Sequence, residues 1–200
     1  MNGKLRIGFA LTGSFCTFDK AIAAARRLKD AGHEIIPIMS FNAAGMDTRF
    51  GKAQEHIEQL ERISGRGVIK TIEGAEPIGP KKMLDILVVA PCTANTAAKL
   101  ALGITDTPVT MAVKSHVRNS LPVVIAISTN DALAAAAKNI GLLQSYKNYY
   151  FVPYRQDCFE KKPFSAVADF DLIENTVAEA AEGRQVQPLL LQIKADGQQR

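Results

Sequence analysis

Short apolar runs alternate with amphipathic segments along most of this chain, and this alternation limits the fold more than any other feature. Apolar runs of strand length are followed each time by segments whose apolar residues recur at helical spacing. The expected strands are 5–11, 34–39, 68–72, 86–90, 123–127 and 149–152, and the expected helices 19–31, 52–63, 95–102, 108–117, 132–146 and 169–181. Alternation of this kind predicts an α/β fold with three layers, in which helices cover both faces of a doubly wound parallel sheet.

The composition fits one globular domain. Of the 200 residues, 47% are hydrophobic and 22% are charged, which is enough to bury a full core. We expect a single domain over 1–183 and a Gln-containing C-terminal tail over 184–200. The apolar run 85–91 is too short for a membrane span, and the N-terminus enters a strand pattern directly, so a cytoplasmic location is expected.

Charge, cysteine and histidine usage exclude several classes of protein. The net charge is +4, but the 24 Lys and Arg residues are scattered, so small anions are better expected ligands than nucleic acids. The three cysteines have no CxxC spacing and the three histidines lie far apart, which predicts neither disulfides nor a metal site. These residues are Cys16, Cys92, Cys158, His33, His56 and His116.

Ligands of open parallel sheets bind beyond the carboxyl ends of the strands, so the residues after each strand are the first candidates. After the first strand, Gly13 and Ser14 offer a backbone turn and a hydroxyl to a phosphate, although a plain turn with a helix cap explains them as well. Ser40 follows the second strand. Because Ser14 and Ser40 follow adjacent strands, their hydroxyls are expected to bind one phosphate together.

The segment Pro91-Cys-Thr-Ala-Asn-Thr96 after the expected strand 86–90 is the densest in polar groups. Helix capping uses one of its side chains, whereas Thr93, Asn95 and Thr96 together suit the polar edge of a heteroaromatic ring. The small Ala94 would let such a ring approach the backbone. We therefore favour a ligand site here over a cap.

Other candidate residues have two interpretations each. Cys92 is a nucleophile or, better supported, a small core residue. His116 and Arg118 indicate either a cationic helix end or, for Arg118, an anion-binding arginine near the crevice. Asn130 and Asp131 orient a substrate or cap the following helix.

At this point the sequence resembles the flavoprotein family, with its Rossmann-like fold, which includes phosphopantothenoyl-cysteine decarboxylases and flavin prenyltransferases. The resemblance rests on Thr12-Gly-Ser14, Ser40 and the PxSANT-like segment 91–96, and spans residues 4 to 150. It implies bound FMN and assembly into trimers or multiples of trimers. The residues that it implies for FMN binding are Gly13, Ser14, Ser40, Thr93, Ala94, Asn95 and Thr96.

Two departures separate the chain from the decarboxylases. Pro77 occupies the position of their catalytic histidine, and the segment 127–130 replaces their PAMN motif. Segments such as 8–14, 48–51, 75–80, 127–133 and 153–157 are instead similar to the B-subunit family of bacterial dipicolinate synthases. That likeness implies an oxidoreductase subunit that forms pyridine-2,6-dicarboxylate during sporulation, as a homo-oligomer, with a partner A subunit that carries NAD(P).

A dicarboxylate substrate needs cationic or hydrogen-bonding partners. The sequence offers Arg49, Lys114, Arg118 and Arg155, with Lys162 as a weaker candidate, and Asn95 and Asn130 are the candidate catalytic residues. Three classes stay open: a subunit of an oxidative synthase, an FMN-dependent decarboxylase or prenyl-transferring relative, and a non-catalytic partner subunit. Pro77 argues against the second class.

Overall fold

A seven-stranded sheet forms the middle layer of the protein in a computed structural model that describes residues 3–192. Its main path runs β2-β1-β3-β4-β7-β6, and β5 pairs with β4 beside that path. The strands are β1 (Arg6–Leu11), β2 (Glu34–Met39), β3 (Ile86–Cys92), β4 (Val123–Thr129), β5 (Tyr149–Phe151), β6 (Tyr154–Gln156) and β7 (Ala166–Ala168).

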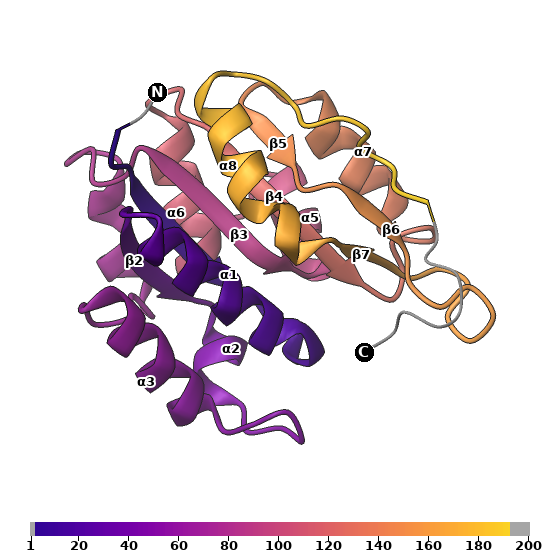
Figure 1. The fold of residues 1–200 in the computed structure, drawn as a ribbon, viewed down its shortest axis with the longest axis horizontal. Helices are drawn as coiled ribbons and strands as arrows, with labels where there is room; N and C mark the ends of the chain where they lie inside the picture. The colour runs from indigo at the N-terminus through magenta and orange to yellow at the C-terminus, as the bar shows by residue number, and fades with distance from the viewer. Residues whose placement is uncertain (1–2, 193–200) are drawn as a thin grey trace.

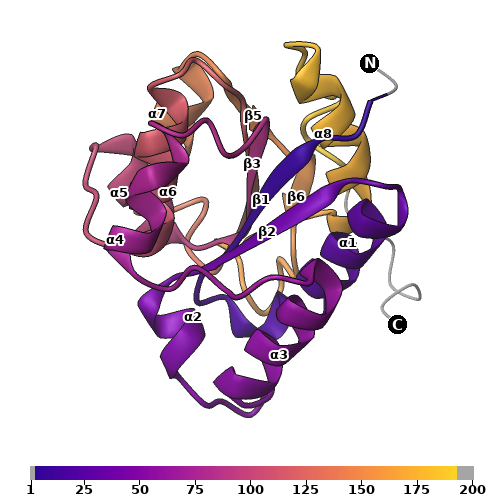
Figure 2. The same ribbon diagram turned by 90° about the vertical axis from the view of Figure 1, so that its left-hand side faces the viewer.

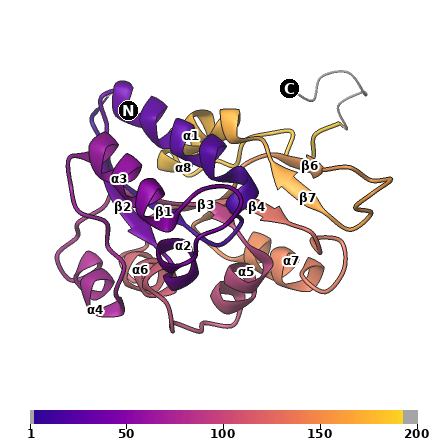
Figure 3. The same cartoon turned by 90° about the horizontal axis from the view of Figure 1, so that it is seen from below.

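Helices cover both faces of this sheet, as the sequence predicts (Figures 1 and 2). One face carries α1 (Phe18–Asp30), α3 (Ala53–Ser64) and α8 (Ile173–Ala181). The other face carries α4 (Ile72–Ala75), α5 (Ala94–Ala101), α6 (Pro108–Val117) and α7 (Ala137–Ser145). Figure 3 shows β2, β1, β3 and β4 side by side between these two helical layers.

Burial on both sides explains the composition of the central strands. Every residue of β3 is buried, and its side chains alternate between two hydrophobic clusters, one under each helical layer. A strand that is covered on both faces has no solvent side, so its sequence is continuously apolar rather than alternating. No helix within residues 3–192 is both long enough and apolar enough to span a bilayer.

The sheet departs from the all-parallel expectation at one edge. The first half of β4 pairs in parallel with β5, whereas Ser128 and Thr129 at its end pair antiparallel with β7. β7 pairs antiparallel with β6 in turn. Neither β6 nor β7 lies in an expected strand, because strands of three residues give almost no periodic signal.

Three further expectations need correction. The segment 68–72 forms one bridge, between Ile69 and Ile38, rather than a strand. Between the expected strand 34–39 and the expected helix 52–63, where no element is expected, lies the short helix α2 (Phe41–Gly45). The helix expected from residue 132 begins at Ala137, because the Leu133 amide donates to the Phe164 carbonyl and the preceding chain forms turns.

The segment after α8 returns along its own domain. The Gln185 side chain accepts a hydrogen bond from Phe151 N and donates one to Phe151 O, each at 2.7 Å. Further along, Tyr154 exchanges backbone hydrogen bonds with Leu189 and Leu191. The part of the expected tail from 184 to 192 therefore extends the sheet edge, and 193–200 lie outside the described residues.

Candidate functional site

Two neighbouring pockets, each of about 430 Å³, open at the carboxyl ends of the strands. Gly13 and Thr93 line both of them. We call the first the Ser40 pocket, lined by Thr12, Gly13, Ser40, Phe41, Asn42, Thr93, Asn95, Thr96, Lys99, Asp106 and Thr107. We call the second the Lys162 pocket, lined by Gly13, Ser14, Cys16, Thr17, Lys20, Thr93, Ser128, Thr129, Asn130, Asp157, Lys162, Ser165, Ala166 and Val167.

A buried threonine fixes the wall between the two pockets. The Thr12 hydroxyl, in a residue only 1% exposed, donates to the Pro91 carbonyl at 2.7 Å and accepts from the Thr93 amide at 3.0 Å. The end of β1 is thereby tied to the turn after β3. Gly13 and Thr93, which both pockets share, are consequently held in fixed positions.

The polar segment after β3 divides its side chains between structure and site. Thr93 caps α5, because its hydroxyl accepts from Thr96 N at 3.2 Å, and it also donates to the Thr96 hydroxyl at 3.1 Å. Among the described residues, the exposed Asn95 side chain has no hydrogen-bond partner, and it lines the Ser40 pocket. Ala94 is half-buried and lines neither pocket.

The second strand end supplies a capping hydroxyl and an aromatic face. Ser40 is 8% exposed and its oxygen accepts from Ala43 N at 3.3 Å, which leaves its own hydrogen available to a ligand. The next residue, Phe41, is 49% exposed and lines the same pocket. Lys99 and Asp106 form an ion pair of 2.7 Å at the rim, so the charges of this pocket balance.

Ser14 turns away from Ser40. Its hydroxyl lies 2.8 Å from the Ser128 hydroxyl, and the Thr17 hydroxyl, 3.4 Å from Ser128, donates to the Ser14 carbonyl. Ser14 and Ser40 line adjacent pockets that share Gly13 and Thr93, and their convergence on one phosphate stays a prediction. Of the seven residues expected at a cofactor, the Ser40 pocket brings together Gly13, Ser40, Thr93, Asn95 and Thr96.

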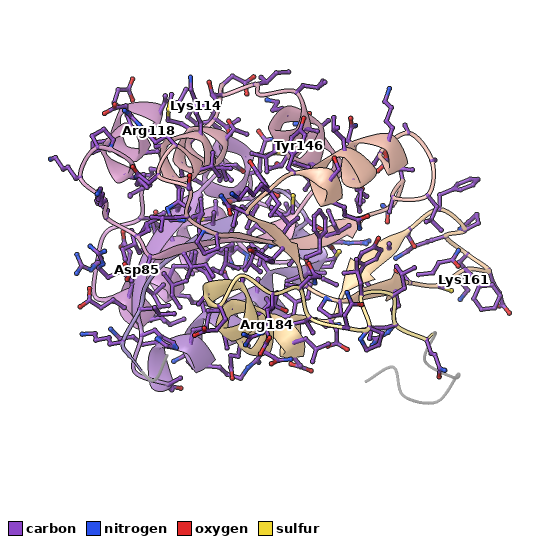
Figure 4. All side chains as sticks on the ribbon, turned by 90° about the horizontal axis from the view of Figure 1, so that it is seen from above. Asp85, Lys114, Arg118, Tyr146, Lys161 and Arg184 are labelled. Atoms are coloured by element: carbon purple, nitrogen blue, oxygen red, sulfur yellow. The ribbon has the colours of Figure 1, made fainter. Side chains whose placement is uncertain are left out.

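The four cations favoured from the sequence line neither pocket. Arg49 is exposed, with its guanidinium 4.8 Å from the centre of the Phe50 ring. Arg155 is paired with Asp169 at 2.8 Å. Figure 4 shows Lys114 and Arg118 together, at the end of the molecule away from Lys161.

Helix direction explains the misplacement of Lys114 and Arg118. In a parallel α/β fold each helix runs back against its strand, so the last turn of a helix lies near the amino ends of the strands. The end of α6 follows this rule, because His116 Nε2 donates at 3.0 Å to the carbonyl of Pro122, which directly precedes β4. The same rule places the first turn of α1, which contains Lys20, near the carboxyl ends of the strands. Lys20 was not among the candidates from the sequence, although this position could have identified it.

Two of the ambiguous residues have structural roles. Cys92 is buried among apolar side chains, and this burial raises the pKa of its thiol to about 12, which removes it as a nucleophile. Burial lowers the pKa of His116 to about 4, and this residue lies away from both pockets. Asn130 lines the Lys162 pocket, whereas the Asp131 carboxylate accepts from the Thr129 hydroxyl at 2.6 Å.

Comparison with known proteins gives a consistent result for the whole chain. A family model described as "Flavoprotein" matches residues 1–184. The B subunit of dipicolinate synthase from Bacillus subtilis (strain 168) is 44% identical over 192 residues, which cover 96% of each chain. The crystal structure of the corresponding B subunit from Bacillus halodurans has a TM-score of 0.88 at 39% identity and covers 96% of this chain and 99% of that one.

A more distant structure is similar to this chain in its fold. Burkholderia xenovorans DmrB, solved in complex with FMN, has a TM-score of 0.66 at 19% identity. The alignment covers 91% of this chain and 98% of DmrB.

Proposed function

This chain belongs to the flavoprotein family and, within it, to the B subunits of dipicolinate synthase, and from that premise we propose that it is an FMN-binding subunit of an oxidoreductase that forms dipicolinate. The partner is an A subunit that carries NAD(P). In the same proposal the chain works in the cytoplasm of the sporulating cell, as a homo-oligomer built from trimers.

Unused hydrogen-bonding groups of the Ser40 pocket are the observation that carries this proposal. Within residues 3–192, neither the Asn42 nor the Asn95 side-chain amide has a protein partner, and both line this pocket. Ser40 adds a free hydroxyl hydrogen, and Phe41 adds an exposed apolar face. Such a mixture suits a cofactor that combines a flat heteroaromatic ring with a polar chain, and the volume lies in the usual range for ligand sites.

The proposed reaction is a dehydrogenation. A dihydrodipicolinate loses a hydride and a proton to become pyridine-2,6-dicarboxylate, and a hydroxytetrahydro precursor first loses water. Bound FMN would supply an acceptor for the two electrons. The residues of this chain would hold and orient the cofactor and the substrate, and the amides of Asn95 and Asn130 are suited to orientation because neither titrates near neutral pH.

An absorption measurement tests the proposal. We expect the purified chain, incubated with FMN and dialysed, to retain the visible absorption of oxidised flavin. Asn95→Ala should weaken FMN binding by about tenfold through the loss of its amide hydrogen bonds. Asn139→Ala, in α7 and outside both pockets, is the matched control and should bind as the wild type does.

Activity separates the proposed role from that of a non-catalytic partner. Co-expressed with the A subunit, Asn95→Ala should co-elute normally but lose dipicolinate formation. Full activity of this variant would identify a subunit that only stabilises its partner. A colourless protein that ignores FMN would overturn the flavin part of the proposal.

A further inference from the structure

The Lys162 pocket carries positive charge that the proposed flavin site does not use. Its lining includes two lysines, Lys20 and Lys162, and one carboxylate, Asp157. Lys162 comes from the segment between β6 and β7, and β7 pairs with the end of β4 at Ser128. The antiparallel strands β6 and β7, which continue the sheet beyond β4 (Figure 3), thus bring Lys162 into the pocket at the strand ends.

Lys20 is an exposed cation beside Asp19 at the start of α1, next to the pocket. It lies in the first turn of α1, where the positive end of the helix dipole disfavours a cation. No carboxylate among residues 3–192 forms an ion pair with it. An anion in the pocket would interact favourably with both the helix dipole of α1 and the Lys20 ammonium.

Lys162 is held in place before any ligand arrives. Its ammonium lies 2.9 Å from Asp157, and this hydrogen bond raises the pKa of Lys162, so the group stays charged at neutral pH. Its backbone donates to the Cys158 carbonyl at 2.7 Å and accepts from the Ser165 hydroxyl at 3.0 Å. The backbone of Lys162 is therefore fixed, while its side chain, 51% exposed, is open to an anion in the pocket.

Neutral donors complete the pocket beside these lysines. Ser14 and Ser128 share one hydrogen bond of 2.8 Å. When Ser128 donates, the Ser14 hydroxyl keeps its own hydrogen for a ligand, and when Ser14 donates, Ser128 can donate to the Thr17 hydroxyl at 3.4 Å. The exposed Asn130 amide, which has no partner within the described part of the chain, lines the same pocket. Ammonium, hydroxyl and amide groups together form the donor set that carboxylates require.

We propose that the Lys162 pocket is the dicarboxylate site of this chain, with Lys162 and Lys20 as the partners of the two carboxylates. This inference rests on the proposed function and names the residues that bind its substrate. It replaces Arg49, Lys114, Arg118 and Arg155, which the structure places outside both pockets. Asp157 positions the Lys162 ammonium through their ion pair of 2.9 Å.

Calorimetric titration of the full chain with pyridine-2,6-dicarboxylate, in metal-free buffer, tests the assignment. Lys162→Gln and Lys20→Gln should each weaken binding by about tenfold and reduce its salt dependence, because each removes one charge-assisted contact. Lys161→Gln is the matched control, since Lys161 is the exposed neighbour of Lys162 and lines neither pocket (Figure 4). The monocarboxylate pyridine-2-carboxylate should bind more weakly to the wild type and be less sensitive to these changes.

Three results would overturn the inference. The first is that all three variants bind pyridine-2,6-dicarboxylate with the affinity of the wild type. The second is that the wild type binds the mono- and the dicarboxylate equally well. The third is that FMN and the dicarboxylate compete for one site. Thermal unfolding of each variant checks that the fold is retained. FMN retention, measured separately by absorption, shows whether the flavin proposal has failed or only the assignment of the two lysines.

Discussion

Replacement of Thr12 by valine tests whether the hydroxyl between β1 and β3 organises the site. Valine has nearly the same shape, so the substitution removes the hydrogen bonds at 2.7 Å to Pro91 O and 3.0 Å from Thr93 N without opening a cavity. The Thr12 amide still donates to Pro91 O at 3.3 Å, which limits the loss at that carbonyl. The Thr93 amide loses its partner.

The expected cost follows from these two bonds. Each contributes about 1 kcal/mol to stability, and Thr93, which is half-buried at the pockets, regains part of its lost bond from water. The free energy of unfolding should therefore fall by about 1–2 kcal/mol, which corresponds to about 2–8 °C in Tm for a chain of this size. FMN affinity should fall at least about tenfold, because Gly13 and the turn after β3 lose their fixed positions.

Thr12→Ser supplies the control for this experiment. Serine keeps both hydrogen bonds and loses one buried methyl group, so it should cost about 1 kcal/mol while FMN affinity stays at the wild-type value. Urea unfolding gives the stability and flavin titration gives the affinity. If Thr12→Val unfolds within about 0.5 kcal/mol of the wild type, as substitutions of surface residues do, the role given to this hydroxyl is refuted.

Three further predictions concern buried polar groups. The His116 pKa is about 4 in the folded chain and about 6.5 in the unfolded one, so its contribution to the free energy of unfolding should be constant above pH 6.5 and fall by about 3 kcal/mol toward pH 4. Urea titrations across this range should show a smaller loss of stability for His116→Gln. An equal dependence of stability on pH in the variant and the wild type would contradict the assignment. Iodoacetamide followed by mass spectrometry should label Cys16 and Cys158 in the folded protein but Cys92 only after unfolding, and rapid labelling of folded Cys92 would show that it is accessible. Both ring nitrogens of His56 are buried without a hydrogen-bond partner in the described residues. His56→Leu should therefore raise the free energy of unfolding by about 1 kcal/mol, as urea unfolding would show. A decrease of about 1 kcal/mol would contradict this, because it would mean that the imidazole makes a stabilising hydrogen bond.

The layered fold and the edge that carries the site were predictable, because both depend on local pattern. The expected strand 86–90 lies within β3, and the expected helix 108–117 coincides with α6. The polar segment 91–96 follows a buried strand, and parallel strands bring their carboxyl ends to one edge. Neither inference requires knowledge of how distant segments pair.

The choice of cations was the least predictable part of the site. Arg155 is neighboured by polar residues in the sequence, but folding pairs it with Asp169, 14 residues away. Lys162 looked like an ordinary surface charge, yet the pairing of β7 with β4 brings it to a pocket. The sequence shows which cationic residues the chain has, but not which groups they contact in the folded protein.

The sequence by itself determined the layers, the order of most elements and the strand ends that carry polar side chains, since hydrophobic periodicity and turn residues act over a few neighbouring positions. Only the tertiary structure decided that Ser14 turns to Ser128, that Thr12 ties β1 to β3, and that Lys162 reaches the site. These contacts join residues from distant parts of the chain, and which partner a side chain meets depends on strand pairing that local pattern does not specify.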